Sequence, residues 1–153
     1  MTKLELLKKC PFVRELDDEQ LSKVAELGCF EVYEAGECIC KQGRPLEKIY
    51  VIEDGLVGLY LEVGPLICRQ LQTASNFEVV GWSAMLPPYR CTTTVKAIDT
   101  TRALVFDGKE LINLCDNVPE IGNKTHRGLA SAIAVRLHHA FTQLMGVIEQ
   151  DLD

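Results

Sequence analysis

The sequence predicts a mainly β domain with flanking helices: an eight-stranded jelly-roll barrel, or double-stranded β-helix, between N-terminal helices and a long C-terminal helix. Two observations support this. Short apolar runs with period two fill residues 30–106 and are separated by turn residues. Helical apolar spacing is found instead in residues 3–28 and 107–150. A chain of 153 residues suffices for one hydrophobic core, so we expect residues 1–153 to form a single domain.

The N-terminal helical region ends in a well-marked second helix. Asp17 is a plausible N-cap because Gln20 stands at the third helical position, where it can complete a capping box. Leu21 and Val24 follow with helical spacing, and Gly28 is expected to stop the helix.

The central region contains eight short segments of strand character. Gly36, Gly43 and Gly55 stand between them at expected turns, and Asp54-Gly55 is a tight-turn signal. The predicted strands are Phe30–Tyr33, Cys38–Lys41, Lys48–Glu53, Gly55–Glu62, Ile67–Thr73, Val79–Val80, Thr92–Ala97 and Arg102–Phe106.

The C-terminal region predicts a short helix and then a long one. Asp107 can cap a helix over Lys109–Cys115, Pro119 can open the next segment, and the long helix is expected over Lys124–Ile148. Its apolar residues cover more of the circumference than one core contact needs, so we expect a homodimer through this helix. The alternative is a helix packed only into its own core. The predicted interface residues are Ile133, Leu137, Ala140, Phe141, Leu144 and Val147.

Composition narrows the class of partner and the compartment. The net charge of -6 and the lack of a basic run argue against direct nucleic-acid binding. No secretory signal and no stretch of membrane-spanning length is present, so we expect a cytoplasmic protein without membrane contact. The seven cysteines are odd in number and scattered, and most should be free thiols.

Three segments in this order resemble cyclic-nucleotide-binding domains of the superfamily of catabolite-activator and fumarate–nitrate-reduction regulators. Residues 33–43 (YEAGECICKQG) resemble the opening of those domains, and residues 49–57 (IYVIEDGLV) resemble their strand-turn-strand. Residues 93–98 (TTVKAI) resemble the strand after the ligand segment. The resemblance covers about residues 5–145. It implies a regulatory domain whose ligand is held by a glycine-led short helix, a glutamate after that glycine and an arginine about ten residues beyond it.

The matching stretch, Gly81–Thr92, which we call the phosphate segment, keeps only part of that pattern. Gly81 and Ala84 fit, but Trp82 stands at the glutamate position and Cys91 at the arginine position. Arg90 is one residue early, and a one-residue offset in a strand turns a side chain to the opposite face. The candidate ligand-binding residues are Gly81, Trp82, Ser83, Ala84, Arg90, Cys91 and Thr92.

These observations predict a non-enzymatic small-molecule sensor that does not bind cAMP or cGMP tightly. Trp82, Tyr89, Arg90 and the Thr92–Thr94 run could instead recognise an aromatic or carboxylate ligand. A closed pocket in a protein-interaction module, and nucleotide binding retained through Arg90, stay open as alternatives.

A haem or redox sensor is the remaining alternative, but the candidate ligands are poorly placed. His138 and His139 are adjacent on a helix and point about 100° apart. No histidine precedes His126, so a barrel metalloenzyme and histidine-assisted nucleophilic catalysis lack support, and we expect no metal and no cofactor. The sequence ends at Asp153, soon after the long helix, so no DNA-binding domain is expected.

Overall fold

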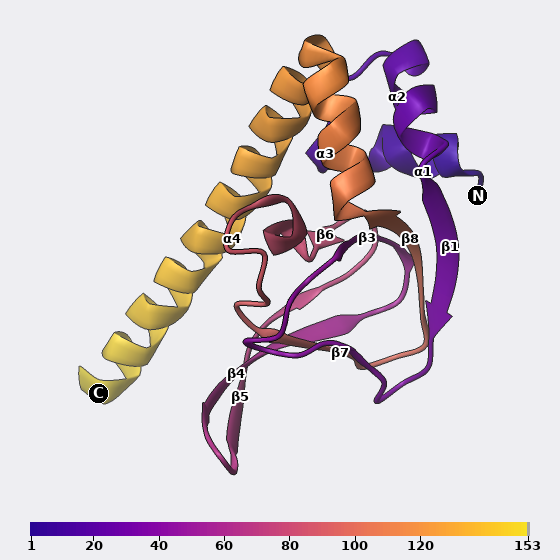
Figure 1. Ribbon diagram of the computed structural model, residues 1–153. Helices are drawn as coiled ribbons and strands as arrows, with labels where there is room; N and C mark the ends of the chain where they lie inside the picture. Colours follow the sequence, from indigo (N-terminus) through magenta and orange to yellow (C-terminus); the bar gives the residue numbers. More distant parts are fainter. Residues whose placement is uncertain (153) are drawn as a thin grey trace.

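The computed structural model describes the backbone of residues 1–152 and the side chains of residues 1–146. The helices are α1 (Lys3–Lys9), α2 (Asp18–Ala25), α3 (Gly108–Asn117) and α4 (Pro119–Leu152), with short 3-10 segments η1 (Pro11–Val13) and η2 (Trp82–Met85). Helices α1, α2 and α3 lie at one end of the strands, and α4 runs along one side of them (Figure 1). The strands are β1 (Gly28–Tyr33), β2 (Cys38–Cys40), β3 (Lys48–Asp54), β4 (Val57–Gly64), β5 (Ile67–Ala74), β6 (Val79–Val80), β7 (Thr94–Ala97) and β8 (Thr101–Asp107). All eight predicted strands are thereby confirmed.

The strands form two antiparallel sheets of four strands each. One sheet has the order β1-β8-β3-β6, and the other has the order β2-β7-β4-β5. The predicted eight-stranded jelly roll is confirmed, and its two sheets are not closed into a barrel, because within residues 1–152 no strand pairing joins them.

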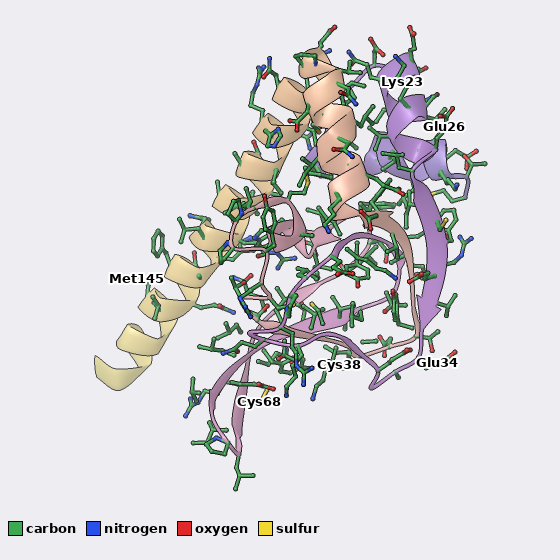
Figure 2. All side chains as sticks on the ribbon, in the orientation of Figure 1. Lys23, Glu26, Glu34, Cys38, Cys68 and Met145 are labelled. Carbon is green, nitrogen blue, oxygen red and sulfur yellow. The ribbon has the colours of Figure 1, made fainter. Side chains whose placement is uncertain are left out.

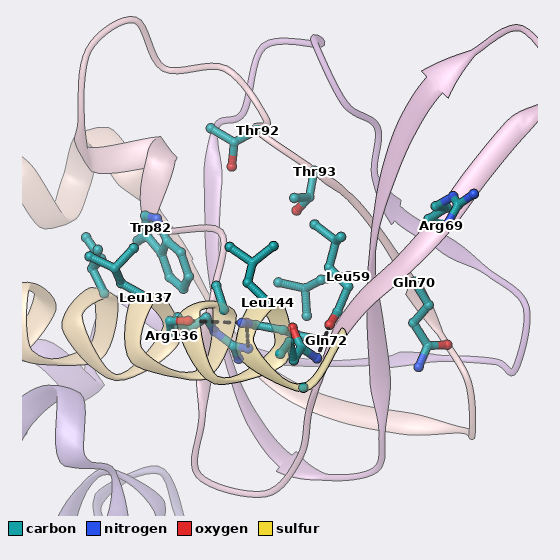
Figure 3. Close-up of a pocket in the computed structure, with 15 residues that line it drawn as sticks. Leu59, Arg69, Gln70, Gln72, Trp82, Thr92, Thr93, Arg136, Leu137 and Leu144 are labelled. Atoms are coloured by element: carbon teal, nitrogen blue, oxygen red, sulfur yellow. Dashed lines mark hydrogen bonds between the residues drawn. The ribbon is translucent and has the colours of Figure 1, made fainter. Parts of the chain in front are cut away.

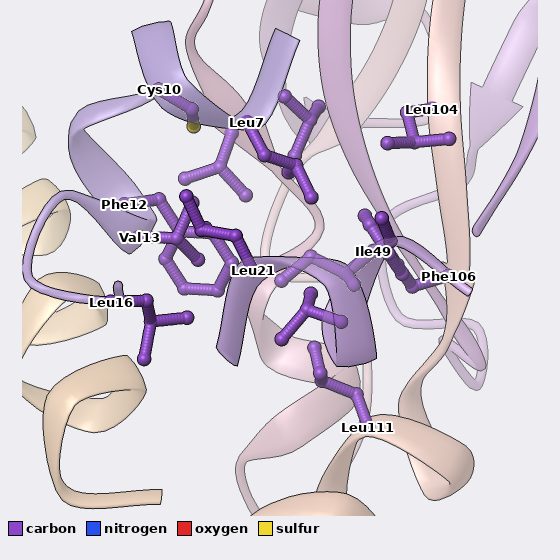
Figure 4. Packing of buried hydrophobic residues seen from close by; sticks show 14 of the residues in the cluster. Leu7, Cys10, Phe12, Val13, Leu16, Leu21, Ile49, Leu104, Phe106 and Leu111 are labelled. Carbon is purple, nitrogen blue, oxygen red and sulfur yellow. The ribbon is translucent and has the colours of Figure 1, made fainter. Parts of the chain in front are cut away.

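Alternation along β3 divides the core into two layers. Ile49 and Val51 face the helices, where they pack with Leu104 and Phe106 of β8 and residues of α1, η1 and α2 (Figure 4). Tyr50 and Ile52, which alternate with them along the strand, point the other way and pack between the sheets. The helices therefore cover one face of the β1-β8-β3-β6 sheet, and the second sheet covers the other.

The predicted helix caps are confirmed. The Asp17 carboxylate accepts a hydrogen bond from the Gln20 amide at 2.9 Å, and the Gln20 side chain accepts one from the Asp17 amide at 3.1 Å. Asp107 accepts hydrogen bonds from the first turn of α3. Gly28 does not cap α2 as predicted, because the helix ends at Ala25 and Gly28 begins β1, where an added Cβ would lie 2.8 Å from the Leu104 side chain.

Helix α4 begins at Pro119, earlier than the predicted Lys124, and runs unbroken for 34 residues. Pro119 fits the first helical position because its fixed φ suits a helix and it has no amide hydrogen to leave unpaired. Farther along, a Cβ at Gly128 would lie 1.8 Å from the Phe12 carbonyl oxygen, so α4 touches the η1 backbone there. Among the described residues, no helix is long and apolar enough to cross a membrane.

Candidate functional site

A cavity of about 910 Å³, which we call the α4 cavity, lies between the second half of α4 and the β2-β7-β4-β5 sheet (Figure 3). The helix contributes Ile133, Leu137 and Leu144, spaced so that they share one face. Leu59 of β4 and Trp82 of η2 lie across from them. The walls are thus mainly apolar, and the volume lies within the range of pockets that enclose small molecules.

Arg136 connects α4 with β5 at the edge of the α4 cavity. Its Nη1 donates hydrogen bonds to Gln72 Oε1 at 3.1 Å and to the Thr73 carbonyl at 3.3 Å. Gln72 Nε2 donates in return to the Arg136 carbonyl at 3.0 Å. The Arg136 side chain is only 12% exposed, and its guanidinium lies 5.7 Å from the centre of the Trp82 ring. Burial lowers the pKa of this guanidinium, and the Glu78 carboxylate at 3.9 Å partly opposes that shift.

The start of the phosphate segment has the backbone expected from the resemblance. Gly81 has φ 83°, and a Cβ there would lie 2.9 Å from the Lys48 carbonyl oxygen, so both conformation and space require glycine. The Ala84 amide donates to the Gly81 carbonyl at 3.0 Å within η2. Ala84 itself is buried against Gly108 and lines neither the α4 cavity nor the small space described next.

The space inside the phosphate segment is small. A pocket of about 20 Å³ is bordered by Gly81, Trp82, Ser83, Cys91 and Thr92, among others. This volume holds about one water molecule. Trp82 and Thr92 also line the α4 cavity, so these two candidate residues are the ones that reach the larger site.

Cys91 supplies no charge to this space. It is 5% exposed and belongs to the same hydrophobic cluster as Cys40, which borders the same small pocket. Burial raises the pKa of both thiols, so both are neutral at physiological pH. All seven cysteines are free thiols, as expected, but only Cys10, Cys91 and Cys115 are buried.

Arg90 faces away from both spaces. It is exposed, and its Nη1 donates a hydrogen bond to the Gly43 carbonyl at 2.9 Å. Its backbone forms an isolated bridge with Pro45. Buried Cys91 and exposed Arg90 therefore lie on opposite sides of the chain, as their one-residue offset predicts.

The predicted interface residues lie on two faces of α4. The cavity face holds Ile133, Leu137, Ala140 and Leu144, of which Leu137 and Leu144 are still more than half exposed. Phe141 is 56% exposed and does not line the cavity, and Met145 points away from the sheets (Figure 2). The side chain of Val147 lies outside the described residues.

The histidines are separate from the α4 cavity. His126 Nδ1 lies 2.7 Å from the Gly122 carbonyl within α4, and the ring centres of His138 and His139 are 6.5 Å apart. Among the side chains that the structure describes, no three His, Cys, Asp or Glu residues are grouped as a metal site requires.

Two arginines of the α4 cavity, Arg69 and Arg136, were not predicted from the sequence. Arg136 interrupts the apolar stripe of α4 between Ile133 and Leu137, which is the signal that could have marked it. Arg69 stands in an unremarkable strand, and only the packing of α4 on β5 brings it to the cavity.

Comparison with known proteins defines the class. The model of the cyclic nucleotide-binding domain family matches residues 30–118. The human cGMP-dependent protein kinase 2 is 25% identical over 133 residues, which make up 86% of this chain and 16% of the kinase. The chain spans less than a third of the length of the first curated relatives that it matches.

Solved structures show the same fold. A cyclic nucleotide-binding domain from Methylobacillus flagellatus superposes with a TM-score of 0.82 at 16% identity, covering 94% of this chain and 81% of that one. The catabolite activator protein of Thermus thermophilus superposes with a TM-score of 0.74 at 21% identity, covering 90% and 62%.

Because the family model matches more than half of the sequence, this chain belongs to the cyclic nucleotide-binding domain family. It has the jelly-roll fold of that family, and the predicted resemblance to cyclic-nucleotide-binding domains is confirmed.

Proposed function

We propose that this chain is a non-enzymatic regulatory domain in which a small-molecule effector binds the α4 cavity and changes the packing of α4. The observation that carries the proposal is that α4 itself forms one wall of the cavity, through Ile133, Leu137 and Leu144. A ligand between the helix and the sheet would contact both, so occupancy would act directly on the helix. The cyclic nucleotide-binding domain fold of the chain supports a role without catalysis, and so does the lack of a nucleophile–base pair among the described residues that line the cavity.

We further infer that cyclic nucleotides bind this domain weakly. The neutral, buried Cys91 and the ring of Trp82 stand where the resemblance places an arginine and a glutamate, and Arg90 is bonded to Gly43 instead. Each missing charged contact costs about 2–5 kcal/mol when its partner stays unpaired. Two such losses weaken binding by several orders of magnitude.

The proposal includes a homodimer through α4. Phe141 and Met145 are exposed on the side opposite the α4 cavity, and Leu137 and Leu144 are exposed at its rim. Exposed large apolar side chains along one helix are typical of protein interfaces. A Phe141→Glu variant is expected to weaken the dimer at least about tenfold. Sedimentation velocity tests this, and the control is Asn123→Glu, at an exposed position near the start of the same helix. Equal dimerisation of the two variants would contradict a dimer interface on α4.

A thermal-shift panel with cAMP, cGMP and small aromatic acids tests effector binding. A ligand present at about 100 times its dissociation constant adds about 2.7 kcal/mol of stability. Trp82→Ala should reduce the shift given by any ligand of the α4 cavity, whereas Tyr89→Ala, an exposed aromatic outside that cavity, should not. If Trp82→Ala changes neither ligand affinity nor dimerisation, the proposed mechanism is wrong. A domain that no small molecule stabilises would instead be a ligand-free interaction module.

A further inference from the structure

The α4 cavity is long. Its helical wall extends from Ile133 to Gly146, which is about 20 Å at 1.5 Å per residue. Ile133, Leu137 and Leu144 present aliphatic carbon along this length, and Leu59 and Leu71 of the sheet do so from the opposite side. A slot with aliphatic walls over such a length suits an extended hydrocarbon chain better than a compact polar molecule.

The two ends of the α4 cavity differ in chemistry. Trp82 and Arg69 lie at opposite ends (Figure 3). Hydrogen bonds show that β5 and α4 run in opposite directions along the cavity. Arg136 bonds to Gln72 and Thr73, whereas Gln143, farther along α4, bonds to the earlier Leu71 carbonyl at 2.6 Å. Arg69 therefore lies beyond Leu71, toward the C-terminal part of the helix.

Arg69 is the cation available to a ligand. It lines the cavity from an exposed position and forms no ion pair with any side chain that the structure describes. Arg136 is already bonded to β5 and lies near Glu78. The described lining contains no Asp or Glu, so the charge around the site is positive at the Arg69 end.

We propose that the α4 cavity binds a straight-chain carboxylate, a medium- to long-chain fatty acid anion, with its carboxylate on Arg69 and its hydrocarbon chain along α4 toward Trp82. This inference rests on the proposed function and names the ligand class of that site. A guanidinium pairs well with a carboxylate through two parallel hydrogen bonds. At about 1.2 Å per bond of an extended chain, roughly sixteen carbons span the 20 Å length of the cavity, and a twelve-carbon chain spans about two thirds of it.

The single tryptophan of the chain gives a site-specific readout, because Trp82 lines this cavity. Its fluorescence is titrated with octanoate, decanoate and dodecanoate below their micelle concentrations, and with 1-dodecanol and dodecylammonium as neutral and cationic comparators. Each added pair of methylenes is expected to tighten binding by up to about fifteenfold, the value for full burial. Dodecanoate is expected to bind most tightly of the three dodecyl compounds.

Arg69 variants test the carboxylate contact. Arg69→Gln should weaken dodecanoate binding about tenfold and leave 1-dodecanol within about twofold, and Arg69→Lys should lie between. Arg14→Ala removes another exposed arginine, outside the α4 cavity, and should change neither. Since Arg69 is exposed, these variants should fold, and their melting curves verify this.

Three results would overturn the inference: no dependence on chain length, dodecylammonium binding as tightly as dodecanoate, or Arg69→Gln weakening acid and alcohol equally. If aromatic acids stabilise the domain and the fatty acids leave Trp82 unperturbed, the ligand class is wrong while the proposed function stands. If none of the small molecules binds, both fail. If the Trp82 fluorescence change instead depends on the concentration of protein and not on that of the ligand, a second copy of the chain occupies the cavity.

Discussion

Replacing Arg136 tests whether α4 is held on the sheet by one side chain. Arg136→Leu keeps an apolar stem but removes the hydrogen bonds of the guanidinium to Gln72 and Thr73. Each contributes about 0.5–1.5 kcal/mol, and the Trp82 ring adds about 0.5–1 kcal/mol. Because a buried arginine loses hydration on folding and leucine does not, part of this sum is offset, and we expect a loss of about 1–2 kcal/mol in the free energy of unfolding.

Two assays measure the effect. Urea unfolding gives the stability change, and limited proteolysis reports local detachment of the helix, which should be cut faster beyond Arg136 in the variant. Arg127→Leu is the matched control, because Arg127 lies on the same helix and makes only an exposed ion pair with Glu15 at 3.5 Å. Its loss should cost less than about 0.5 kcal/mol.

The outcome shows whether the Arg136 side chain holds α4 on the sheet or only lies in contact with it. If Arg136→Leu is within about 0.5 kcal/mol of the parent protein and α4 is cut no faster, hydrogen bonding by this arginine does not hold the helix. If the Arg136 side chain holds the helix, Arg136→Leu and Gln72→Ala should be non-additive, because both remove the hydrogen bond from Arg136 Nη1 to Gln72 Oε1.

Two further predictions concern other parts of the fold. Gly128→Ala is expected to destabilise the domain by about 2–4 kcal/mol, because the new Cβ would lie 1.8 Å from the Phe12 carbonyl oxygen. Gly146→Ala is the control, because its Cβ would meet no atom within 4 Å. Thermal unfolding of the two variants measures the difference in stability. Burial raises the pKa of the Cys10 thiol from 9.0 to about 11, so folding favours its neutral form and stability should fall as pH rises from 9 to 11, by at most about 2–3 kcal/mol. Urea unfolding across that range measures this loss, and Cys10→Ala should show a smaller one; an equal slope in both proteins would contradict the assignment to Cys10.

The parts of the fold predicted from sequence are those that local chemistry decides. Capping at Asp17 and Asp107 depends on residues three positions away or less, and both caps are confirmed. The turn glycines are confirmed in the same way, since Gly36, Gly43 and Gly55 all have positive φ. The strand positions could be predicted because the alternation of apolar residues and the turn residues are both visible in a short stretch of sequence.

The parts that failed depend on contacts between distant segments. The role of Gly28 depends on its neighbour Leu104 in β8, which lies far away in the sequence. Arg69 enters the site only because α4 crosses β5, and no spacing within the strand predicts that crossing. Apolar periodicity likewise predicted the α4 stripe but could not tell its cavity face from its outer face, which required the positions of Leu144 and Phe141 in space.

Trp82 links the altered phosphate segment to the long helix. The residue stands at the position where the resemblance places a glutamate, its ring lies 5.7 Å from the Arg136 guanidinium, and it lines both the small pocket and the α4 cavity. Arg136 in turn bonds to β5. A ligand that displaces the Trp82 ring would therefore weaken the support of the residue that ties α4 to the sheet, and one that packs on the ring would strengthen it. Trp82 thus gives the α4 cavity a direct connection to the helix.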